Sequence, residues 1–165
     1  MKVAICPGSF DPVTLGHLDI IERTTNLFDK VIVLVMSNSA KHTSSFTIEE
    51  RIDLLKRCTS SFSNVEIDTY NGLLVDYAKQ KGAVAIVKGL RAVSDYDYEF
   101  QQALTNKRIN PDVETVFLTA NSKNMFLSSS IVKEVCRLGG DISSFVPNII
   151  HDDIYNRCKG ENKND

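Results

Sequence analysis

The sequence predicts an α/β protein with three layers, in which helices cover both faces of a parallel five-stranded sheet. Short apolar runs alternate along the chain with segments of helical periodicity. Two of these runs, Val31–Met36 and Ala83–Val87, consist entirely of apolar residues. Such runs are typical of strands that are buried on both faces, as in a parallel sheet. The 165 residues contain no internal repeat, low-complexity tract or linker to a second domain.

Five strands are expected, each a short run rich in β-branched residues. In chain order they are Lys2–Cys6, Val31–Met36, Val65–Asp68, Ala83–Val87 and Val113–Leu118. A segment of helical periodicity separates each strand from the next, which supplies the crossover that parallel pairing requires. Sheets of this Rossmann-like kind bind ligands beyond the carboxyl ends of their strands, near a reversal in strand order.

The first three helices are indicated by their faces and their ends. The first helix has one face formed by Leu18, Ile21, Thr25 and Phe28. Thr47 and Glu50 form a capping box that opens the second helix, because each side chain can bond the other residue's backbone N–H. The apolar stripe of that helix consists of Ile48, Ile52 and Leu55. The third helix spans Leu73–Lys81 and is stopped by Gly82.

Three further helices complete the expected fold. Ser94–Arg108 begins with acidic residues and ends with cations, which is the arrangement that the helix dipole favours. Ser128–Leu138 is stopped by a pair of glycines. Pro147 suits the first turn of a last helix that runs through Ile154. Residues 1–158 are therefore expected to form one domain, followed by a polar tail over residues 159–165.

The composition excludes several classes of protein. Hydrophobic residues make up 42% and charged residues 24% of the chain, as in ordinary globular domains. A net charge of −2 does not fit a general nucleic-acid binder, which usually has a strongly basic domain. No apolar run approaches the roughly 20 residues of a membrane helix, and Pro7 and Gly8 interrupt any signal-peptide core. A cytoplasmic location without membrane contact is expected.

The four cysteines are scattered along the chain and include no C-x-x-C pair. The histidines do not stand beside them at the spacing of zinc ligands. A disulfide framework is not expected in a chain with a core of normal size. The cysteines are therefore interpreted as reduced thiols that mainly pack in the core.

The segment Pro7–His17 connects the first strand to the first helix. Gly8 and Gly16 let the backbone approach a ligand closely, and N–H groups at a helix start attract phosphate. Ser9 adds a hydroxyl donor, and His17 can donate an imidazole N–H to a phosphate oxygen. The segment is neither a Walker A loop nor a G-x-G-x-x-G fingerprint. The alternative is an ordinary strand-to-helix turn with one surface histidine.

The segment Lys88–Glu99 follows the fourth predicted strand. Lys88 and Arg91 flank Gly89 at the carboxyl end of that strand, where both cations could reach one anionic ligand. The acidic and aromatic residues up to Glu99 could hold a base and a ribose. Without the cations, a solvated helix start with acidic residues would explain the pattern equally well.

Two further segments could contact an anion. Ser128, Ser129 and Ser130 stand at a predicted helix start, where hydroxyls and free N–H groups could bind a polyphosphate. Capping alone needs only one serine. Lys41 lies in a loop of small polar residues and could cover a phosphate. Taken by itself, Lys41 is more simply explained as a solvated surface residue.

Thr14-Leu15-Gly16-His17 resembles the T/H-x-G-H signature of the nucleotidyltransferase superfamily. As far as Ile150, the chain is similar in length, motif order and spacing to the bacterial phosphopantetheine adenylyltransferase family. The most diagnostic stretches are Pro7–His17, Phe46–Arg51, Gly89–Ser94 and Ser128–Glu134. The resemblance implies that residues 1–158 form a single nucleotidyltransferase domain.

The resemblance also implies a reaction, in which the adenylyl group of ATP is transferred to 4′-phosphopantetheine by direct in-line displacement. The products would be dephospho-coenzyme A and pyrophosphate, in the penultimate step of coenzyme A biosynthesis. The attacking phosphate oxygen is already ionised, so no general base is required. Catalysis would depend on alignment and on fixed donors. Mg²⁺ is expected to be carried by the ATP phosphates, with no metal ligand from the protein.

Matching the motifs of the family assigns roles to individual residues. The catalytic residues would be His17, Lys41 and Arg91, with His17 donating to the α-phosphate. Those binding ATP would be Ser9, Phe10, His17, Gly89, Leu90, Arg91, Glu99, Asn124, Met125, Phe126, Leu127, Ser128, Ser129 and Ser130. Those binding 4′-phosphopantetheine would be Ser9, Lys41, Leu74 and Lys88. Members are typically homohexamers and can be inhibited by coenzyme A, so both properties are expected.

Two positions depart from the family pattern. Lys88 stands where many members have Arg, which keeps the charge but loses the bidentate fork. Asn124-Met125 replaces a start of the nucleotide loop that often contains an aromatic residue. A relative acting on nicotinamide mononucleotide or glycerol phosphate is one alternative, although such relatives usually carry His in place of Thr14. A non-catalytic module that senses ATP is another, although it would not need His17 together with both cations.

Overall fold

The computed structural model describes residues 1–36, 44–91 and 93–161. Helices and strands alternate in the predicted order. The strands are β1 (Val3–Gly8), β2 (Lys30–Val35), β3 (Val65–Thr69), β4 (Ala83–Leu90) and β5 (Glu114–Thr119). The α-helices are α1 (Leu15–Thr25), α2 (Ile48–Thr59), α3 (Leu74–Gln80), α4 (Val93–Ile109), α5 (Ser129–Arg137) and α6 (His151–Glu161). Two short 3₁₀ helices, η1 (Ser122–Asn124) and η2 (Asn148–Ile150), precede α5 and α6.

The five strands form one parallel sheet in the order β3-β2-β1-β4-β5. The central strands β1 and β2 are buried along most of their length, and β4 is buried at Ala83 and from Ala85 to Val87. Because β1 pairs with β2 on one side and β4 on the other, the direction in which the chain adds strands reverses there. The predicted three-layer, Rossmann-like α/β fold is confirmed.

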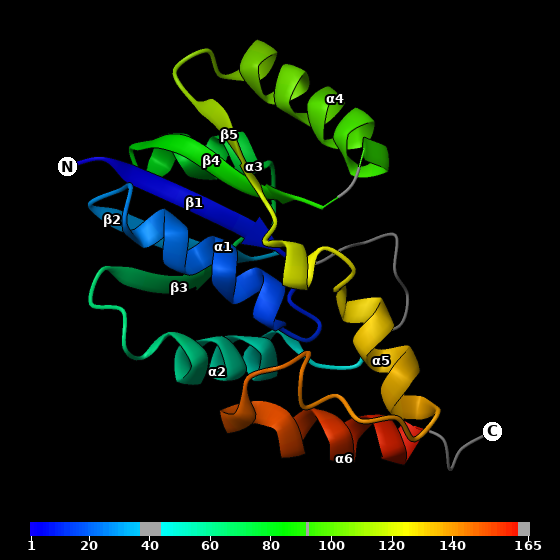
Figure 1. The fold of residues 1–165 in the computed structure, drawn as a ribbon. Helices are drawn as coiled ribbons and strands as arrows, with labels where there is room; N and C mark the ends of the chain where they lie inside the picture. Colours follow the sequence, from blue (N-terminus) through cyan, green and yellow to red (C-terminus); the bar gives the residue numbers. More distant parts are fainter. Residues whose placement is uncertain (37–43, 92, 162–165) are drawn as a thin grey trace.

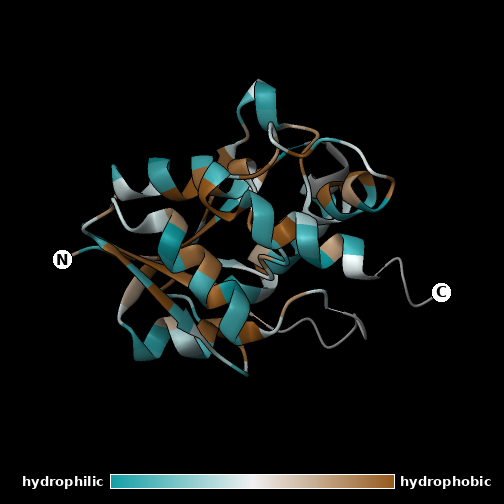
Figure 2. Ribbon diagram, turned by 90° about the horizontal axis from the view of Figure 1, so that it is seen from below, coloured by the Kyte–Doolittle hydropathy of each residue, from teal (hydrophilic) through white to brown (hydrophobic). Residues whose placement is uncertain are grey.

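Helices cover both faces of the sheet, and each face has its own apolar core (Figure 1). α1 and α2 pack on one face, against side chains such as Val33 of β2 and Val87 of β4. α3 packs on the other face, against Ile32 and Ile86. In Figure 2 the apolar colour follows the strands, while the helices turn polar residues outward. The alternation of side chains along each strand therefore supplies two cores.

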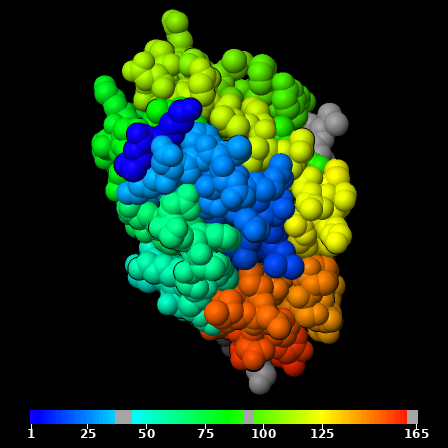
Figure 3. Space-filling view, turned by 60° about the vertical axis from the view of Figure 1, so that its left-hand side comes forward, coloured from blue at the N-terminus to red at the C-terminus, as the bar shows by residue number. Residues whose placement is uncertain are grey.

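The last part of the chain enlarges the core on the α1 and α2 face. Val132 and Cys136 of α5 and Ile154 and Cys158 of α6 are buried with the side chains of that face. Figure 1 shows α5 beyond the carboxyl ends of the strands, while α6 runs below α2 and α5. Figure 3 shows α1, α2 and α6 together on one side of the molecule. α5 is consequently held close to the edge of the sheet where ligands are expected.

The strands at the centre of the sheet are longer than predicted. β1 continues through Gly8, and β4 continues through Leu90. Lys88, Gly89 and Leu90 pair with β5, so they belong to the strand and not to a following loop. Neither a lysine nor a glycine prolongs an apolar run, and only the partner strands reveal that these residues are extended.

The helix boundaries also differ from the expectation at two places. α1 begins at Leu15 and ends before Asn26, so Phe28 lies outside it. α6 begins four residues after Pro147 and runs through Glu161, beyond the predicted end at Ile154. Burial of Cys158 and the position of Lys159 over the Tyr155 ring accompany this extension. The predicted tail is therefore helical at its start.

The cysteines are free thiols, and Cys6, Cys136 and Cys158 are buried, in agreement with their predicted packing role. Burial raises the pKa of Cys6 to about 12, which leaves its thiol protonated and unreactive at neutral pH. Within the described ranges, no helix is both long enough and apolar enough to span a membrane.

The position of β4 in the sheet predicts that truncation of two valines of that strand will cost different amounts of folding stability. Val87 is 1% exposed and Val84 is 42% exposed. Val87→Ala should lower the free energy of unfolding by about 2 kcal/mol, because two methyl groups leave a packed core. Val84→Ala, the matched control, should cost less than about 1 kcal/mol. Urea unfolding of both variants measures the difference, and equal losses would contradict this placement of β4.

Candidate active site

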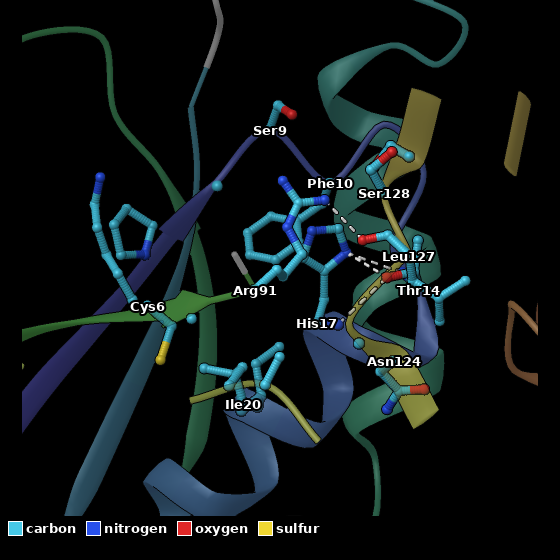
Figure 4. Close-up of a pocket in the computed structure, with 18 of the residues that line it drawn as sticks. Cys6, Ser9, Phe10, Thr14, His17, Ile20, Arg91, Asn124, Leu127 and Ser128 are labelled. Carbon is cyan, nitrogen blue, oxygen red and sulfur yellow. Dashed lines mark hydrogen bonds between the residues drawn. The ribbon is translucent and has the colours of Figure 1, made fainter. Parts of the chain in front are cut away.

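A cavity of about 350 Å³ lies at the carboxyl ends of β1 and β4. The turn after β1, the start of α1, the end of β4 and the start of α5 form its walls (Figure 4). Glu99 of α4 also lines it. The cavity therefore lies where the strand order reverses, which is the predicted place for a ligand.

The chain makes a tight turn directly after β1, and this turn forms one wall of the cavity. Ser9 faces the cavity, and Phe10 follows with a φ of 45°. Phe10 is buried, and its ring lies edge-on to the imidazole of His17 at 5.1 Å between centroids. A Cβ atom at Gly8 would come within 2.9 Å of the Phe10 ring, so a residue without a side chain is needed there.

Thr14 and His17 form a capping box at the start of α1. The backbone N–H of His17 donates to Thr14 Oγ1, and the backbone N–H of Thr14 donates to His17 Nδ1 at 3.0 Å. Because Nδ1 accepts a hydrogen bond, it carries a lone pair, and the proton of the neutral ring is on Nε2. Nε2 lies on the opposite edge of a ring that lines the cavity (Figure 4). The box thus presents an N–H donor to a ligand.

The surroundings of His17 keep its imidazole neutral. Burial of the ring, and secondly the positive charge of Arg91, lower the pKa of His17 to about 4. Protonation of Nδ1 would also destroy its bond with the Thr14 N–H. At neutral pH the ring is therefore a hydrogen-bond donor without a charge, and not a cation.

Two cations stand on the wall formed by β4. Arg91 Nη1 donates to the carbonyl oxygen of Leu127 at 2.8 Å, which ties the end of β4 to the approach to α5. Lys88 forms an ion pair with Glu99 of α4 at 2.5 Å, and both side chains are largely buried. A Cβ atom at Gly89 would lie 2.9 Å from the Ile20 side chain of α1. The close approach of β4 to α1 therefore requires glycine.

The three serines at the start of α5 serve different contacts. Ser128 is the N-cap, and its Oγ accepts from the Ile131 N–H at 3.1 Å. Ser129 Oγ donates to the carbonyl oxygen of Pro12 at 2.7 Å, which joins α5 to the turn after β1. Ser130 is exposed at the rim of the cavity. The first N–H groups of a helix have no backbone partner within it, and the residues at the start of α5 line the cavity.

Most of the residues predicted to form a site line this one cavity. They are Ser9, Phe10, His17, Lys88, Gly89, Arg91, Glu99, Asn124, Leu127, Ser128, Ser129 and Ser130. Four predicted residues are not among its lining: Leu74, Leu90, Met125 and Phe126. Leu74 packs with the core on the α3 face, and Met125 and Phe126 are exposed. Lys41 lies outside the described residues.

Two features of the site were missed by the sequence interpretation. Thr14 was identified only as the first residue of the T-x-G-H signature, whereas its N–H and Oγ1 both contact His17 Nδ1. The usual capping-box pattern has Glu or Gln at the fourth position, so the His in this position concealed it. The Lys88–Glu99 pair joins residues that were assigned to different ligands. No local signal indicates that pair, because Glu99 reaches Lys88 across a strand-to-helix connection.

Among the described residues, no group of three or more His, Cys, Asp or Glu side chains is arranged to hold a metal ion. The cavity instead offers hydroxyls, N–H groups and two cationic side chains. These donors fit phosphate oxygens, and they do not fit a bare cation.

Comparison with a family model defines the class of protein. The model described as cytidylyltransferase-like matches residues 5–135. The match includes most of β1 and the whole T-x-G-H signature, and it continues through most of α5. The fold and the site described above are those of a cytidylyltransferase-like domain.

Curated relatives narrow the class to one family. A phosphopantetheine adenylyltransferase from Caldanaerobacter subterraneus subsp. tengcongensis is 57% identical over 96% of this chain and 99% of its own length. One from Alkaliphilus metalliredigens is 55% identical over 91% of this chain and 95% of its own length. One from Dictyoglomus turgidum is 52% identical, with 96% and 99% covered. The chain belongs to the bacterial phosphopantetheine adenylyltransferase family.

A solved structure shows the same fold at greater distance. A Vibrio parahaemolyticus protein, described as a nicotinate-nucleotide adenylyltransferase, superimposes with a TM-score of 0.69. The match covers 95% of this chain and 96% of that protein, at 20% sequence identity. This likeness supports the fold alone.

The capping box and the lowered pKa predict the titration of His17. In ¹⁵N NMR spectra its imidazole should be neutral at pH 6, with the proton on Nε2 and a titration midpoint near 4. Since the unfolded chain takes up this proton near pH 6.5 and the folded chain does not, stability should fall as pH drops from about 6.5 to 4.

The spectrum of His17→Gln shows which imidazole signal belongs to His17, because that signal is missing in the variant. A midpoint above 6, or a proton on Nδ1, would contradict the geometry of the Thr14–His17 box.

Proposed function

We propose that the chain transfers the adenylyl group of ATP to 4′-phosphopantetheine, giving dephospho-coenzyme A and pyrophosphate. This is the penultimate step of coenzyme A biosynthesis. The observation that carries the proposal is the presence, in one cavity, of the neutral His17 donor, two cations and the start of α5. The names of the relatives, at 50–57% identity over nearly the whole chain, support the acceptor.

The proposed mechanism is a direct in-line displacement. A phosphate oxygen of 4′-phosphopantetheine attacks the α-phosphorus of ATP, and the bond from that phosphorus to the oxygen bridging the β-phosphate breaks. Pyrophosphate leaves with the electron pair of that bond, and no proton has to be removed from the nucleophile. His17 Nε2–H donates to an α-phosphate oxygen while Arg91 compensates the developing negative charge. Fixed donors suit this task because they need no rearrangement as the charge develops.

The ligands are assigned to different parts of the site. We assign ATP to the residues from Asn124 to Ser130, to Gly89, Leu90, Arg91 and Glu99, and to the turn of Ser9 and Phe10. The serines would contact the β- and γ-phosphates. Lys88 and Lys41 would hold the phosphate of 4′-phosphopantetheine, and its arm would extend past the cavity to Leu74.

Mg²⁺ is proposed to arrive bound to the ATP phosphates. The donor set of the cavity supports this, since it consists of groups that bind phosphate oxygens. Magnesium commonly retains water and phosphate ligands in nucleotide sites, and needs little from the protein.

We also propose a homohexamer in the cytoplasm that binds coenzyme A as a feedback inhibitor. The hexamer and the inhibition follow the family pattern. Several large apolar side chains of α4 are exposed, among them Phe100, Leu104 and Ile109, and association of subunits would cover such a surface. Coenzyme A contains both proposed ligand moieties, a pantetheine arm and an adenosine nucleotide, so it could occupy the same cavity.

The acceptor is tested by measuring pyrophosphate release from ATP and Mg²⁺ with one acceptor at a time. Release is expected with 4′-phosphopantetheine and not with nicotinamide mononucleotide or glycerol phosphate. Release with nicotinamide mononucleotide alone would support the proposed mechanism but would show that the acceptor is this mononucleotide and not 4′-phosphopantetheine. ATP binding without release in any mixture would instead indicate a nucleotide sensor.

The role of His17 predicts a kinetic effect of its removal. His17→Ala should lower kcat by roughly 10²-fold or more, with smaller changes in KM, because the donor acts mainly in the transition state. His151→Ala, the same change outside the cavity lining, is the matched control and should retain normal turnover. Near-normal kcat in purified His17→Ala would remove His17 from the mechanism.

A further inference from the structure

The stretch Phe46–Arg51 is diagnostic of the family, yet none of its residues lines the cavity. Its last residue, Arg51, projects from α2 and is only 3% exposed. A guanidinium is almost never buried to this degree unless partners satisfy its charge and its five N–H groups. The contacts of Arg51 therefore indicate what this stretch does.

Arg51 bonds two loops that are distant in sequence. Its Nε donates to the carbonyl oxygen of Phe46 at 2.8 Å, just before α2. Its Nη1 donates to the carbonyl oxygen of Ser9 at 3.1 Å, in the turn that forms one wall of the cavity. The Nε also lies 3.5 Å from Asp11 Oδ1. One planar side chain thus joins the start of α2 to the turn after β1.

Asp11 completes a buried charge cluster, which we define as Asp11, Arg51 and Lys133. Asp11 is 8% exposed and accepts the backbone N–H groups of Phe46, at 2.9 Å, and of Ser45, at 3.2 Å. Lys133 of α5 donates to its Oδ2 at 3.0 Å. Burial alone would raise the pKa of Asp11, but Lys133 and the two N–H donors bring it below its ordinary value. Asp11 is therefore ionised at neutral pH, and the cluster connects the turn after β1 with α2 and α5.

The bond from Arg51 also determines the orientation of one peptide group. In a trans peptide the carbonyl and the following N–H point in opposite directions. Because the Ser9 carbonyl points to Arg51, the N–H of Phe10 points away from it. Phe10 has a φ of 45°, a conformation that a residue with a side chain keeps only when its surroundings require it. Arg51 is the side chain that bonds the carbonyl directly before this residue.

We propose that Arg51 is a positioning residue for adenylyl transfer, because it holds the Ser9–Phe10 turn in the orientation that the ligands require. This rests on the proposed function, in which that turn contacts both substrates. Arg51 itself does not touch the substrates. Lys could not replace it, since a single ammonium on a flexible stem cannot bond the Ser9 and Phe46 carbonyls with the planar geometry of a guanidinium.

The test compares Arg51→Lys with Arg57→Lys, a matched change on the same helix. Arg57 bonds Asp153 and the carbonyl of Ile149, and it is not part of the cavity lining. Arg51→Lys should lower kcat roughly 10-fold or more, because a displaced turn misaligns the reacting groups. Its unfolding midpoint should stay within a few degrees of the parent chain. Arg57→Lys should leave kcat unchanged.

A second measurement separates positioning from stability. The backbone amide signal of Phe10 in ¹H-¹⁵N spectra should shift in Arg51→Lys and stay in place in Arg57→Lys. If Arg51→Lys fails to fold, Asp11→Asn replaces it, because it removes the charge opposite Arg51 and keeps an oxygen acceptor for the Phe46 N–H. Asp11→Asn should lower the unfolding midpoint, because Lys133 and the Ser45 N–H lose their carboxylate acceptor. It should also shift the Phe10 amide and lower kcat by more than the loss of folded protein accounts for.

The outcomes separate this proposal from the proposed function. A parent-like kcat in the folded variant would overturn the positioning role. A loss of activity that only matches the loss of folded protein would overturn it too, since Arg51 would then act on stability alone. If the parent chain itself releases no pyrophosphate with 4′-phosphopantetheine, the proposed function fails. In that case the Phe10 amide signal of Arg51→Lys is the remaining test. A shifted signal supports the proposal that Arg51 holds the turn, and an unshifted signal overturns that proposal.

Discussion

The site depends on the reversal of strand order at the centre of the parallel sheet. All strands end at the same edge, and the chain leaves β1 toward β2 but later returns to place β4 on the other side of β1. α1 consequently packs on one face, and α4 follows β4 to the other. The two helices diverge at the edge and leave a space between them. The cavity occupies this space, so the fold creates it before any functional side chain is considered.

The start of α1 shows how one interaction serves both folding and chemistry. A helix start leaves N–H groups without intrahelical partners, and a capping box satisfies two of them. Here the reciprocal acceptor is an imidazole nitrogen, so capping by Thr14 and His17 also selects the tautomer of the ring. The signature T-x-G-H therefore has a structural explanation for two of its residues: the Thr caps the helix and orients the His, while Gly16 between them lines the cavity. Burial and the nearby Arg91 then keep the ring neutral.

Much of the fold could be predicted from the sequence, because its helices and strands follow from patterns among neighbouring residues. The strands, the order of the helices and the Thr47–Glu50 capping box all rest on neighbouring residues. The ends of β4 and α6 were placed wrongly because the residues beyond the predicted ends are held by tertiary contacts: Lys88 pairs with β5, and Cys158 of α6 packs in the core. Spacing located the four loop segments, and three of them meet at the cavity. It could not separate Leu127, which faces that cavity, from Phe126, which packs on Phe145.

The described side chains of the cavity are held in place before a ligand arrives. Glu99 pairs with Lys88 and His17 is neutral, while Arg91 keeps its positive charge and is held by the Leu127 carbonyl. A polyanion would meet donors that are already oriented, which lowers the cost of reorganisation in the reaction. The bond from Arg91 to Leu127 and that from Ser129 to Pro12 also join the walls to one another. Since the proposed substrates lie against different walls, these links keep the α-phosphate and its attacking group in one frame. The buried charge cluster of Asp11, Arg51 and Lys133 extends that frame to α2, outside the reach of the substrates.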